Sequence, residues 1–392
     1  MRPAQGCGLF GAHQALCGMK NTVLLLHSVV GCSFGTLALH LPGQMQDVRQ
    51  SCTVISDDEV IFGGEQALEK AIASARELYR PDGVLIISGC VSEMIGDDLR
   101  AVTDRAARQG PVLSVSAPGF QGGFQEGFEK ATAALLDWMR PCRRRSRRVN
   151  LIGLGGDEPR VREDGEAFRD LLCGAGAECL ILGHCSIDEL REAPAAALNL
   201  VLGRGVELAR QMEQRFGIPY KLLAYPFGIT GARALWQALP EDFSGEWAVL
   251  EREMAKALSG PLKTVYPYLQ ALYGMPAAIL ASGARADGLR RFLEQELGMA
   301  VVCCARRESL GDQEEFYDRV RRSESALLFA SSFEQDLAEE LSLPLVRVDY
   351  PVFDRVALSG RPLIGARGTL CLLEDILNAI MEARTKREAV YR

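Results

Sequence analysis

Short apolar runs alternate with amphipathic stretches along the whole chain. Residues 83–88, GVLIIS, form a continuous apolar run that follows the turn-forming segment Pro81-Asp82-Gly83, which is typical of a buried strand in a parallel sheet. Residues 64–79 instead place apolar side chains at three- and four-residue spacing, which predicts an amphipathic helix. This alternation favours an α/β protein in which helices flank parallel sheets.

The strand candidates fall into three groups, which predict three Rossmann-like parallel-sheet domains at 1–148, 149–270 and 271–392. The strands are expected at 21–27, 83–88 and 110–115; at 149–152, 178–182 and 198–202; and at 276–280, 300–303, 326–330 and 345–349. Further helices are expected at 247–259 and 369–388. The arginine-rich run at 141–148 is interpreted as a linker between the first two domains, with a docking patch for an acidic partner as the alternative.

Composition narrows the classes of protein that are possible. The 392 residues carry a formal net charge of −7, so there is no overall basic surface of the kind that nucleic-acid binders show. The first residues have no apolar signal region, and the run Val23-Leu24-Leu25-Leu26 is far too short to span a bilayer. We therefore expect a cytoplasmic protein with neither a membrane nor a nucleic-acid partner. Its 12 cysteines should then be mostly reduced thiols.

Three cysteines, Cys7, Cys32 and Cys90, stand where helix-like patterns begin. Because ligand sites collect at the carboxyl ends of parallel strands, cysteines placed there can converge although they are far apart in sequence. Converging thiolates suit an iron–sulfur cluster or zinc. The chain has no CxxC pair, so the spacing alone leaves buried structural thiols as the alternative.

The surroundings of these cysteines resemble the nitrogenase component 1 family, above all the β chain of the molybdenum–iron protein. The resemblance is strong from about residue 3 to 128 and again near the carboxyl end, and looser between about 155 and 343. The resemblance depends first on the spacings between Cys7 and Cys32 and between Cys32 and Cys90. It also depends on several short segments that occur in the same order as in the family. These are His27 before Gly31-Cys32, Ser51-Cys52-Thr53-Val54-Ile55-Ser56, Val60-Ile61-Phe62-Gly63-Gly64, Ile95-Gly96-Asp97-Asp98, Tyr350-Pro351-Val352-Phe353-Asp354-Arg355 and Pro362-Leu363-Ile364-Gly365.

By this resemblance, Cys7, Cys32 and Cys90 ligate an iron–sulfur cluster at the interface with a second component 1-type chain, identical or homologous. The cluster is either a [4Fe–4S] or an [8Fe–7S] cluster of the P-cluster type. Three thiolates cannot complete a four-cysteine site, so a further ligand must come from elsewhere. Gly31 and Gly89 would let the backbone approach the cluster and donate N–H groups to its sulfurs.

The sequence also departs from the family. The catalytic α chain anchors its large cofactor with a cysteine after an Asn-Leu-Val stretch, but here Asn199-Leu200-Val201-Leu202 is followed by Gly203. Its second anchor is a histidine, and Arg347-Val348-Asp349-Tyr350 contains none. A nitrogenase-type cofactor held in that manner is therefore not expected. A serine that helps to ligate the oxidised cluster in some β chains is replaced around Pro118-Gly119-Phe120, which makes a simple [4Fe–4S] cluster the more direct expectation.

The remaining candidates are expected to be structural. Cys17 and Cys52 are interpreted as packing residues, His27 as a buried histidine with its hydrogen bonds satisfied, and Asp97 and Asp98 as helix-start carboxylates. On paper a second metal site could form from Cys173, Cys179, His184 and Cys185, but the strand expected at 178–182 would separate them. The segment 153–156 lacks the full dinucleotide-binding spacing.

Three functions are weighed. The first is an enzyme: the electron-accepting iron–sulfur subunit of a nitrogenase-like reductase, active as a complex and supplied with electrons by an ATP-dependent reductase similar to the nitrogenase iron protein. The alternative is a scaffold on which a nitrogenase-type metal cofactor is assembled. The third is an iron-free α/β protein with core cysteines. The substrate is open, with a tetrapyrrole and a small organic sulfur compound as equal possibilities.

Overall fold

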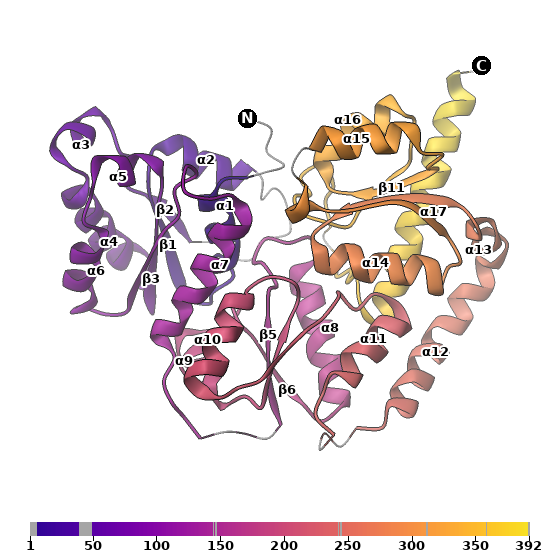
Figure 1. Ribbon diagram of the computed structural model, residues 1–392, viewed down its shortest axis with the longest axis horizontal. Coiled ribbons are helices and arrows are strands. Elements are labelled where there is room, and N and C mark those ends of the chain that lie inside the picture. The colour runs from indigo at the N-terminus through magenta and orange to yellow at the C-terminus, as the bar shows by residue number, and fades with distance from the viewer. Residues whose placement is uncertain are drawn as a thin grey trace. The chain divides into compact units, whose positions relative to one another are not determined.

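The computed structural model describes residues 6–38, 49–143, 145, 147–241, 243, 245–310, 313–357 and 359–390. It contains two compact units, Met1–Asp157 with Leu180–Lys221, and Glu158–Cys179 with Leu222–Arg392. Three four-stranded parallel sheets flanked by helices make up the fold, which confirms the predicted fold class (Figure 1). The predicted domain boundaries at 148 and 270 stay a prediction.

The first sheet lies in the first unit and has the strand order β2-β1-β3-β4. Its central strands are buried along their whole length, as their continuous apolar runs require. Leu24 pairs with Leu85 and His27 with Ser88, so β1 and β3 end side by side. The strands are β1 (Thr22–His27), β2 (Gln50–Cys52), β3 (Gly83–Ser88) and β4 (Val112–Ser116).

Helices cover both faces of this sheet (Figure 1). On one face α4 and α6 pack Leu68, Ile72 and Val102 against the sheet. On the other face α1 and α7 pack Leu9 and Phe128, and this core continues to residues of the middle sheet. The helices of this region are α1 (Gly8–Leu16), α2 (Val30–Ala38), α3 (Asp57–Phe62), α4 (Glu65–Tyr79), α5 (Cys90–Ile95), α6 (Leu99–Ala107) and α7 (Phe124–Ala134), followed by the 3₁₀ turn Leu135–Trp138.

The middle sheet has the order β6-β5-β7-β8. Asn150 and Asn199 lie opposite each other on β5 and β7, and the Asn150 Nδ2 group donates to Asn199 Oδ1 at 2.8 Å. This pairing gives two buried amides a partner, which burial requires. The elements are β5 (Arg148–Ile152), β6 (Glu178–Ile181), β7 (Leu198–Val201), β8 (Tyr220–Leu222), α9 (Ile187–Arg191), α10 (Val206–Phe216) and the 3₁₀ turn Ala193–Ala195.

The second unit is built around the sheet β10-β9-β11-β12. Ala278, Leu280, Phe316 and Leu328 belong to its core. Its strands are β9 (Pro276–Ala281), β10 (Ala300–Arg306), β11 (Leu327–Ala330) and β12 (Leu345–Arg347). Its helices are α8 (Val161–Gly174), α11 (Gly228–Gln237), α12 (Trp247–Thr264), α13 (Tyr266–Leu272), α14 (Gly283–Gln295), α15 (Gln313–Arg322), α16 (Gln335–Glu340) and α17 (Gly365–Val390), with 3₁₀ turns at Arg307–Ser309 and Ser332–Glu334.

A buried ionic network also lies in the second unit. The Arg285 guanidinium donates to the Glu158 carboxylate at 2.7 Å and lies 4.1 Å from the centre of the Tyr225 ring. The Tyr225 hydroxyl in turn donates to Asp164 at 2.5 Å. Burial of a charge is costly unless it is paired, and here each charged group has a partner. Within the described ranges, no helix is both long and apolar enough to cross a bilayer.

Helices α1 and α7 approach each other at two glycines. A Cβ atom added at Gly11 would lie 1.8 Å from the Phe124 carbonyl oxygen, and one added at Gly127 would lie 1.9 Å from the Gly8 carbonyl oxygen. Neither position therefore accepts a side chain unless the helices separate.

We predict that Gly127→Ala destabilises the protein by about 1–3 kcal/mol or more, because overpacking forces the backbone apart. The matched control is Gly260→Ala in α12, where an added Cβ meets nothing within 4 Å. The control should be neutral or stabilising, because glycine within a helix costs roughly 0.5–1 kcal/mol relative to alanine. Urea unfolding of the two variants measures the difference, and equal free energies of unfolding would contradict the assigned contact.

Candidate functional site

The carboxyl edge of the first sheet brings two of the predicted cysteines to neighbouring positions. Cys90 is the first residue of α5 and follows β3 after Gly89, and Cys32 lies in the first turn of α2, shortly after β1. Because β1 and β3 are adjacent and in register, both cysteines stand at the same edge of the sheet. This is the edge at which open parallel sheets carry their ligand sites.

Cys7 reaches the same edge by a different route. It is the residue that precedes α1, and it pairs with Gly123 in an isolated antiparallel bridge. The amide of Gly8 also donates to the Gly122 carbonyl oxygen at 3.1 Å. The loop that follows β4 therefore holds Cys7 beside the sheet.

Gly119 in this loop lies against two of the cysteines. Its backbone N–H donates to Cys90 Sγ at 3.2 Å. A Cβ atom at this position would lie 2.7 Å from Cys7 Cβ, and 3.6 and 3.7 Å from the sulfurs of Cys90 and Cys7. The sequence shows a glycine-rich loop here but no sign of this contact, because the contact depends on how the loop folds back.

The thiols of Cys32 and Cys90 lie close enough to Cys7 to affect its pKa. Burial raises the pKa of the Cys7 thiol, and the nearby Cys32 and Cys90 raise it further, because neighbouring thiolates repel a new negative charge. The three sulfurs are not gathered around one point: within the described ranges, the group of possible ligands whose atoms all lie within 4.8 Å of one another is His13, Cys17 and Asp157. Thiols spread in this way suit a multi-iron cluster, whose irons bind separate cysteines, better than a single ion.

The two predicted glycines differ in their surroundings. A Cβ added at Gly31 would meet nothing within 4 Å, so this position is open. A Cβ added at Gly89 would lie 2.4 Å from Ser28 Oγ, and the Gly89 amide donates to the His27 carbonyl oxygen at 3.0 Å. Close packing against Ser28 therefore requires glycine at position 89.

His27 connects three segments of the first unit. Its Nε2 atom lies 2.8 Å from Asp97 Oδ2, its Nδ1 atom lies 3.1 Å from Thr53 Oγ1, and Asp97 Oδ1 accepts a hydrogen bond from the Gly64 amide at 2.8 Å. Asp98 caps α6 by accepting from the Ala101 amide. These contacts agree with the structural roles expected for His27, Asp97 and Asp98.

Several other cysteines are buried or half-buried thiols. Cys52 Sγ donates to the Ser28 carbonyl oxygen at 3.3 Å, and burial raises the pKa of its thiol. Burial raises the pKa of Cys179 and of Cys185 to about 12. For Cys17, burial and then the Asp157 carboxylate raise the pKa well above its ordinary value. All four are therefore expected to be protonated thiols at neutral pH when no cation is near.

Exposed apolar side chains lie on α2 and α5, which contain Cys32 and Cys90, and also on α3 and in the loop at Gly119. Phe34 on α2 is 73% exposed, Phe62 at the end of α3 is 84% exposed, and Met94 on α5 is 75% exposed. We call the group the apolar rim: Val30, Phe34, Ile61, Phe62, Met94 and Phe120. Exposed large apolar groups gathered around one site are typical of an interaction surface.

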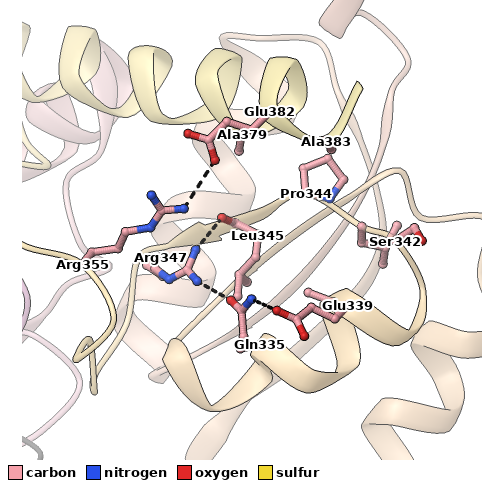
Figure 2. A pocket seen from close by; sticks show the side chains of 12 residues that line it. Gln335, Glu339, Ser342, Pro344, Leu345, Arg347, Arg355, Ala379, Glu382 and Ala383 are labelled. Carbon is pink, nitrogen blue, oxygen red and sulfur yellow. Dashed lines mark hydrogen bonds and ion pairs between the residues drawn. The ribbon is translucent and has the colours of Figure 1, made fainter. Parts of the chain in front are cut away.

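The second unit carries a cavity of about 260 Å³ between α16, β12 and α17 (Figure 2). Its charged side chains pair with one another: Arg355 lies 3.6 Å from Glu382, and Arg347 binds Gln335 and the Leu345 carbonyl oxygen. Because Arg347 and Arg355 already bind neighbouring protein groups, these side chains do not indicate a ligand for the cavity.

Residues 7–381 match the family described as nitrogenase component 1 type oxidoreductase. The chain belongs to this family. It is 30% identical over 320 residues to the nitrogenase iron-molybdenum cofactor biosynthesis protein NifE of Rippkaea orientalis, a match that covers 78% of this chain and 67% of that protein. It is 25% identical over 432 residues to the nitrogenase iron-molybdenum cofactor biosynthesis protein NifN of a Nostoc species, covering 99% and 94% of the two chains.

The family resemblance inferred from the sequence is thereby confirmed. The nitrogenase molybdenum-iron protein beta chain of Methanococcus maripaludis is 23% identical over 449 residues, covering 97% of this chain and 94% of that one. Among solved structures, nitrogenase Cp1 at pH 6.5 superposes with a TM-score of 0.83 at 21% identity, over 99% of this chain and 94% of that chain. This structural likeness establishes the fold.

The buried position of His27 predicts a pH dependence of stability. Burial lowers the pKa of His27 from its ordinary value of 6.5, although Asp97 opposes the shift. Well above pH 6.5 the imidazole is neutral in both the folded and the unfolded chain, so it contributes nothing to the pH dependence. As the pH falls below 6.5 the unfolded chain binds a proton that the folded chain does not, so stability decreases.

We therefore expect the free energy of unfolding of the wild type to fall more between pH 7.5 and 5.5 than that of His27→Gln, which cannot titrate. Urea unfolding under anaerobic conditions at several pH values measures both. The two proteins should have parallel pH profiles between pH 7.5 and 8.5. Parallel profiles down to pH 5.5 as well would show that His27 is not held neutral.

Proposed function

We propose that this chain is the electron-accepting iron–sulfur subunit of a nitrogenase-like reductase. In this proposal Cys7, Cys32 and Cys90 ligate a cluster at the interface with a second component 1-type chain, identical or homologous. An ATP-dependent reductase of the iron-protein type supplies electrons, and the cluster relays them to a substrate site. The observation that supports this most directly is that three thiols stand at one edge of a sheet, where α2, α5 and the loop at Gly119 also carry side chains of the apolar rim.

The apolar rim supports the presence of a partner chain. Side chains as exposed as Phe34 and Phe62 lose contact with water only when another surface covers them, and burial of apolar area stabilises an interface by about 25 cal/mol per Å². Three thiols also leave a cluster short of ligands, which a second chain can provide. A single interface with a second chain would therefore both cover the apolar rim and supply the missing cluster ligands.

The loop at Gly119 supports a [4Fe–4S] cluster in preference to an [8Fe–7S] cluster. Residues 117–121 are Ala-Pro-Gly-Phe-Gln, so no serine is available there as an oxygen ligand. Any side chain at position 119 would collide with Cys7 Cβ. The glycine instead places a backbone N–H on Cys90 Sγ, and hydrogen bonds to cluster sulfurs raise the reduction potential by stabilising the added negative charge.

The substrate site is proposed to lie on, or to be completed by, the partner chain. Gly203 occupies the position after β7 at which the α chain would carry a cysteine, and its φ of 74° is one that side chains other than glycine rarely adopt. At the other anchor position Arg347 pairs with Asp354. A tetrapyrrole and a small organic sulfur compound are equal candidates as the substrate. The complex is proposed to work in the cytoplasm without nucleic acid.

A second candidate is a scaffold for assembly of a nitrogenase-type metal cofactor. It is favoured by the names of the relatives NifE and NifN, which are cofactor biosynthesis proteins. A scaffold and an electron-accepting subunit can share the same cysteines, so the cluster alone does not separate them. A scaffold should transfer its cluster to an acceptor that lacks one, whereas the reductase subunit should retain its cluster through repeated turnover.

We predict that protein purified without oxygen contains about two irons per chain for a shared [4Fe–4S] cluster, or about four for a shared eight-iron cluster. Iron and sulfide quantitation with EPR, before and after dithionite, measures this. Cys7→Ala, Cys32→Ala and Cys90→Ala should each lose most of the iron. The matched control Cys52→Ala, at another half-buried cysteine of the same edge, should keep it.

Wild-type iron content in all three variants, or a well-folded anaerobic protein without iron, would reject the cluster. Substantially more than four irons per chain would indicate an additional cofactor and favour the scaffold. Incubation of the loaded protein with an apo-acceptor then separates the two candidates, because cluster transfer without any ATP-dependent turnover would contradict the reductase.

The apolar rim gives a separate prediction. Phe34→Glu should weaken association with the second chain by at least tenfold, because it places a charge in an interface that must exclude water. The matched control is Leu78→Glu on α4, which changes a side chain that is likewise 73% exposed but lies outside the rim. Analytical ultracentrifugation of the purified complex measures both. An unchanged dissociation constant for Phe34→Glu would place the interface elsewhere.

A further inference from the structure

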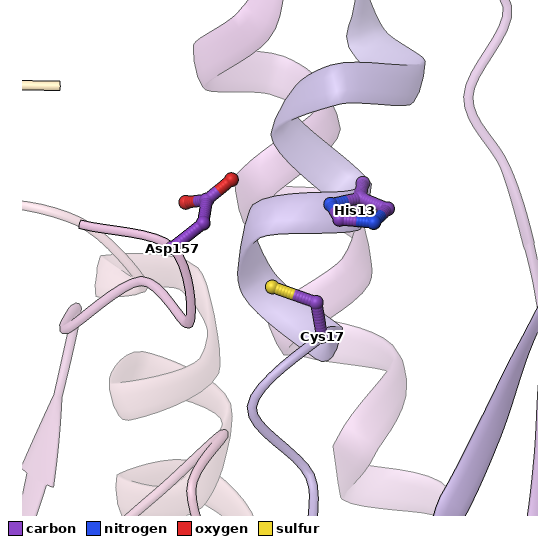
Figure 3. A group of neighbouring side chains, drawn as sticks. All are labelled: His13, Cys17 and Asp157. Atoms are coloured by element: carbon purple, nitrogen blue, oxygen red, sulfur yellow. The ribbon is translucent and has the colours of Figure 1, made fainter. Parts of the chain in front are cut away.

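A group of possible metal ligands lies at the end of α1 opposite to Cys7. His13 and Cys17 are four residues apart, so they lie on the same side of the helix. Asp157 lies in the middle of the loop between β5 and α8. One ligand atom from each residue lies within 4.8 Å of the others, and the side chains converge on a common point (Figure 3).

The loop that carries Asp157 is held tightly against α1. The Gly156 amide donates to the Gln14 carbonyl oxygen at 2.7 Å. A Cβ at Gly156 would lie 2.6 Å from Cys17 Sγ, and one at Gly155 would lie 2.4 Å from Gln14 Cγ. Two glycines therefore let the backbone approach closely enough to bring the Asp157 carboxylate to Cys17. A side chain that reaches a helix in this way is fixed in position before any ion binds.

Hydrogen bonds around Gln50 determine which nitrogen of His13 carries the lone pair. The Gln50 Nε2 group donates to Ser33 Oγ at 3.0 Å and to Thr36 Oγ1 at 2.9 Å, so its Oε1 atom is the one that faces His13. Oε1 accepts hydrogen bonds only, and it lies 2.8 Å from His13 Nε2. Nε2 is therefore protonated, and in the neutral ring Nδ1 carries the lone pair.

This is the arrangement that metal-binding histidines generally show. One ring nitrogen donates to an oxygen acceptor, which orients the ring and leaves the other nitrogen to bind the ion. In Figure 3 the ring nitrogen near the backbone is turned toward Cys17 and Asp157. Gln50 thus orients the His13 ring and holds the proton on Nε2, as residues that support metal-binding histidines do.

The charges of the group match a divalent cation. His13 and Asp157 are buried, with Asp157 only 3% exposed, and Cys17 is half-buried. A thiolate and a carboxylate together carry two negative charges, which a divalent ion neutralises. A neutral assembly costs far less to bury than an isolated charge. One nitrogen, one sulfur and one oxygen donor form a mixed set that suits Zn²⁺, which takes four ligands in tetrahedral geometry.

We propose that His13, Cys17 and Asp157 form a mononuclear zinc site, with His13 Nδ1, Cys17 Sγ and an Asp157 carboxylate oxygen as ligands and water in the fourth position. This assignment revises the expectation that Cys17 is only a packing residue. The site is separate from the three cysteines of the sheet edge, since Cys7 and Cys17 flank the nine-residue helix α1 and so lie about 15 Å apart. It therefore does not depend on the proposed iron–sulfur cluster.

Zinc content tests the proposal in the full-length protein. Anaerobically purified protein is incubated with zinc chloride, desalted, and analysed by elemental mass spectrometry, which distinguishes zinc from iron. We expect about one zinc per chain in the wild type, and at least a tenfold weaker zinc affinity for Cys17→Ser and for His13→Gln. The iron content should be unchanged in both variants. X-ray absorption at the zinc edge should show one sulfur at about 2.3 Å and otherwise nitrogen or oxygen neighbours.

The matched control is Cys185→Ser, which removes another cysteine of the same unit that lies outside the group. It should keep the wild-type zinc content. Retention of zinc by both Cys17→Ser and His13→Gln, or a zinc shell without sulfur, would overturn the proposal. So would a wild-type protein that retains no zinc after desalting, because the three residues would then form a metal-free hydrogen-bonded cluster. Circular dichroism identifies any variant that has failed to fold, and the folded variant then decides.

Discussion

The contact between α1 and α7 positions the chemistry of the first unit. The two helices meet at Gly11 and Gly127, where a carbonyl oxygen occupies the space that a side chain would need. Helix α1 has Cys7 at its beginning and Cys17 just after its end. Any movement of this helix against α7 would therefore displace thiols at both ends at once. The packing of α1 against α7 therefore determines the positions of both Cys7 and Cys17.

The sheet and its loops complete the arrangement. The register of β1 with β3 aligns the strand ends that precede Cys32 and Cys90, and the loop after β4 returns to hold Cys7. Each cysteine thus lies just before or within the first turn of a helix, where the backbone N–H groups favour negative charge. Burial raises the pKa of the Cys7 thiol and so disfavours a thiolate there, and the Gly119 N–H donates to the sulfur of Cys90. A cation or cluster that shares the negative charge would offset the cost of burying a thiolate at Cys7.

Most of the sheet framework could be predicted from the sequence, because long apolar runs bounded by turns define buried strands. Residues 83–88 form β3 as predicted, and the helix predicted at 64–79 begins one residue later as α4. Strands β2 and β8 were missed: each has three residues, and none of them is fully buried, so neither shows an apolar run. Helix α12 continues to Thr264, beyond the predicted end at 259, although Pro261 lies inside it.

The site could be predicted only in part, because local sequence patterns reveal some of its residues and not the contacts between distant segments. Cys7, Cys32 and Cys90 each precede or begin a helix, so local patterns reveal them. The contact of Gly119 with Cys90, and that of Asp157 with Cys17, join segments far apart in the chain. Nothing in the local sequence around Asp157 distinguishes it from any other loop carboxylate. Such pairs become visible only when the packing of α1 against its neighbours is known.

The Gln50 side-chain amide connects α1 and α2 through hydrogen bonds in which its donor and acceptor ends have different partners. Its NH₂ group is held by Ser33 and Thr36 on α2, the helix that carries Cys32, and its oxygen is held by His13 on α1. An amide cannot exchange donor and acceptor at one end without doing so at the other. The position of the His13 ring is thus coupled through one amide to the positions of Ser33 and Thr36. The helix that follows Cys7 and the helix that contains Cys32 are consequently joined by the hydrogen bonds of a single side chain.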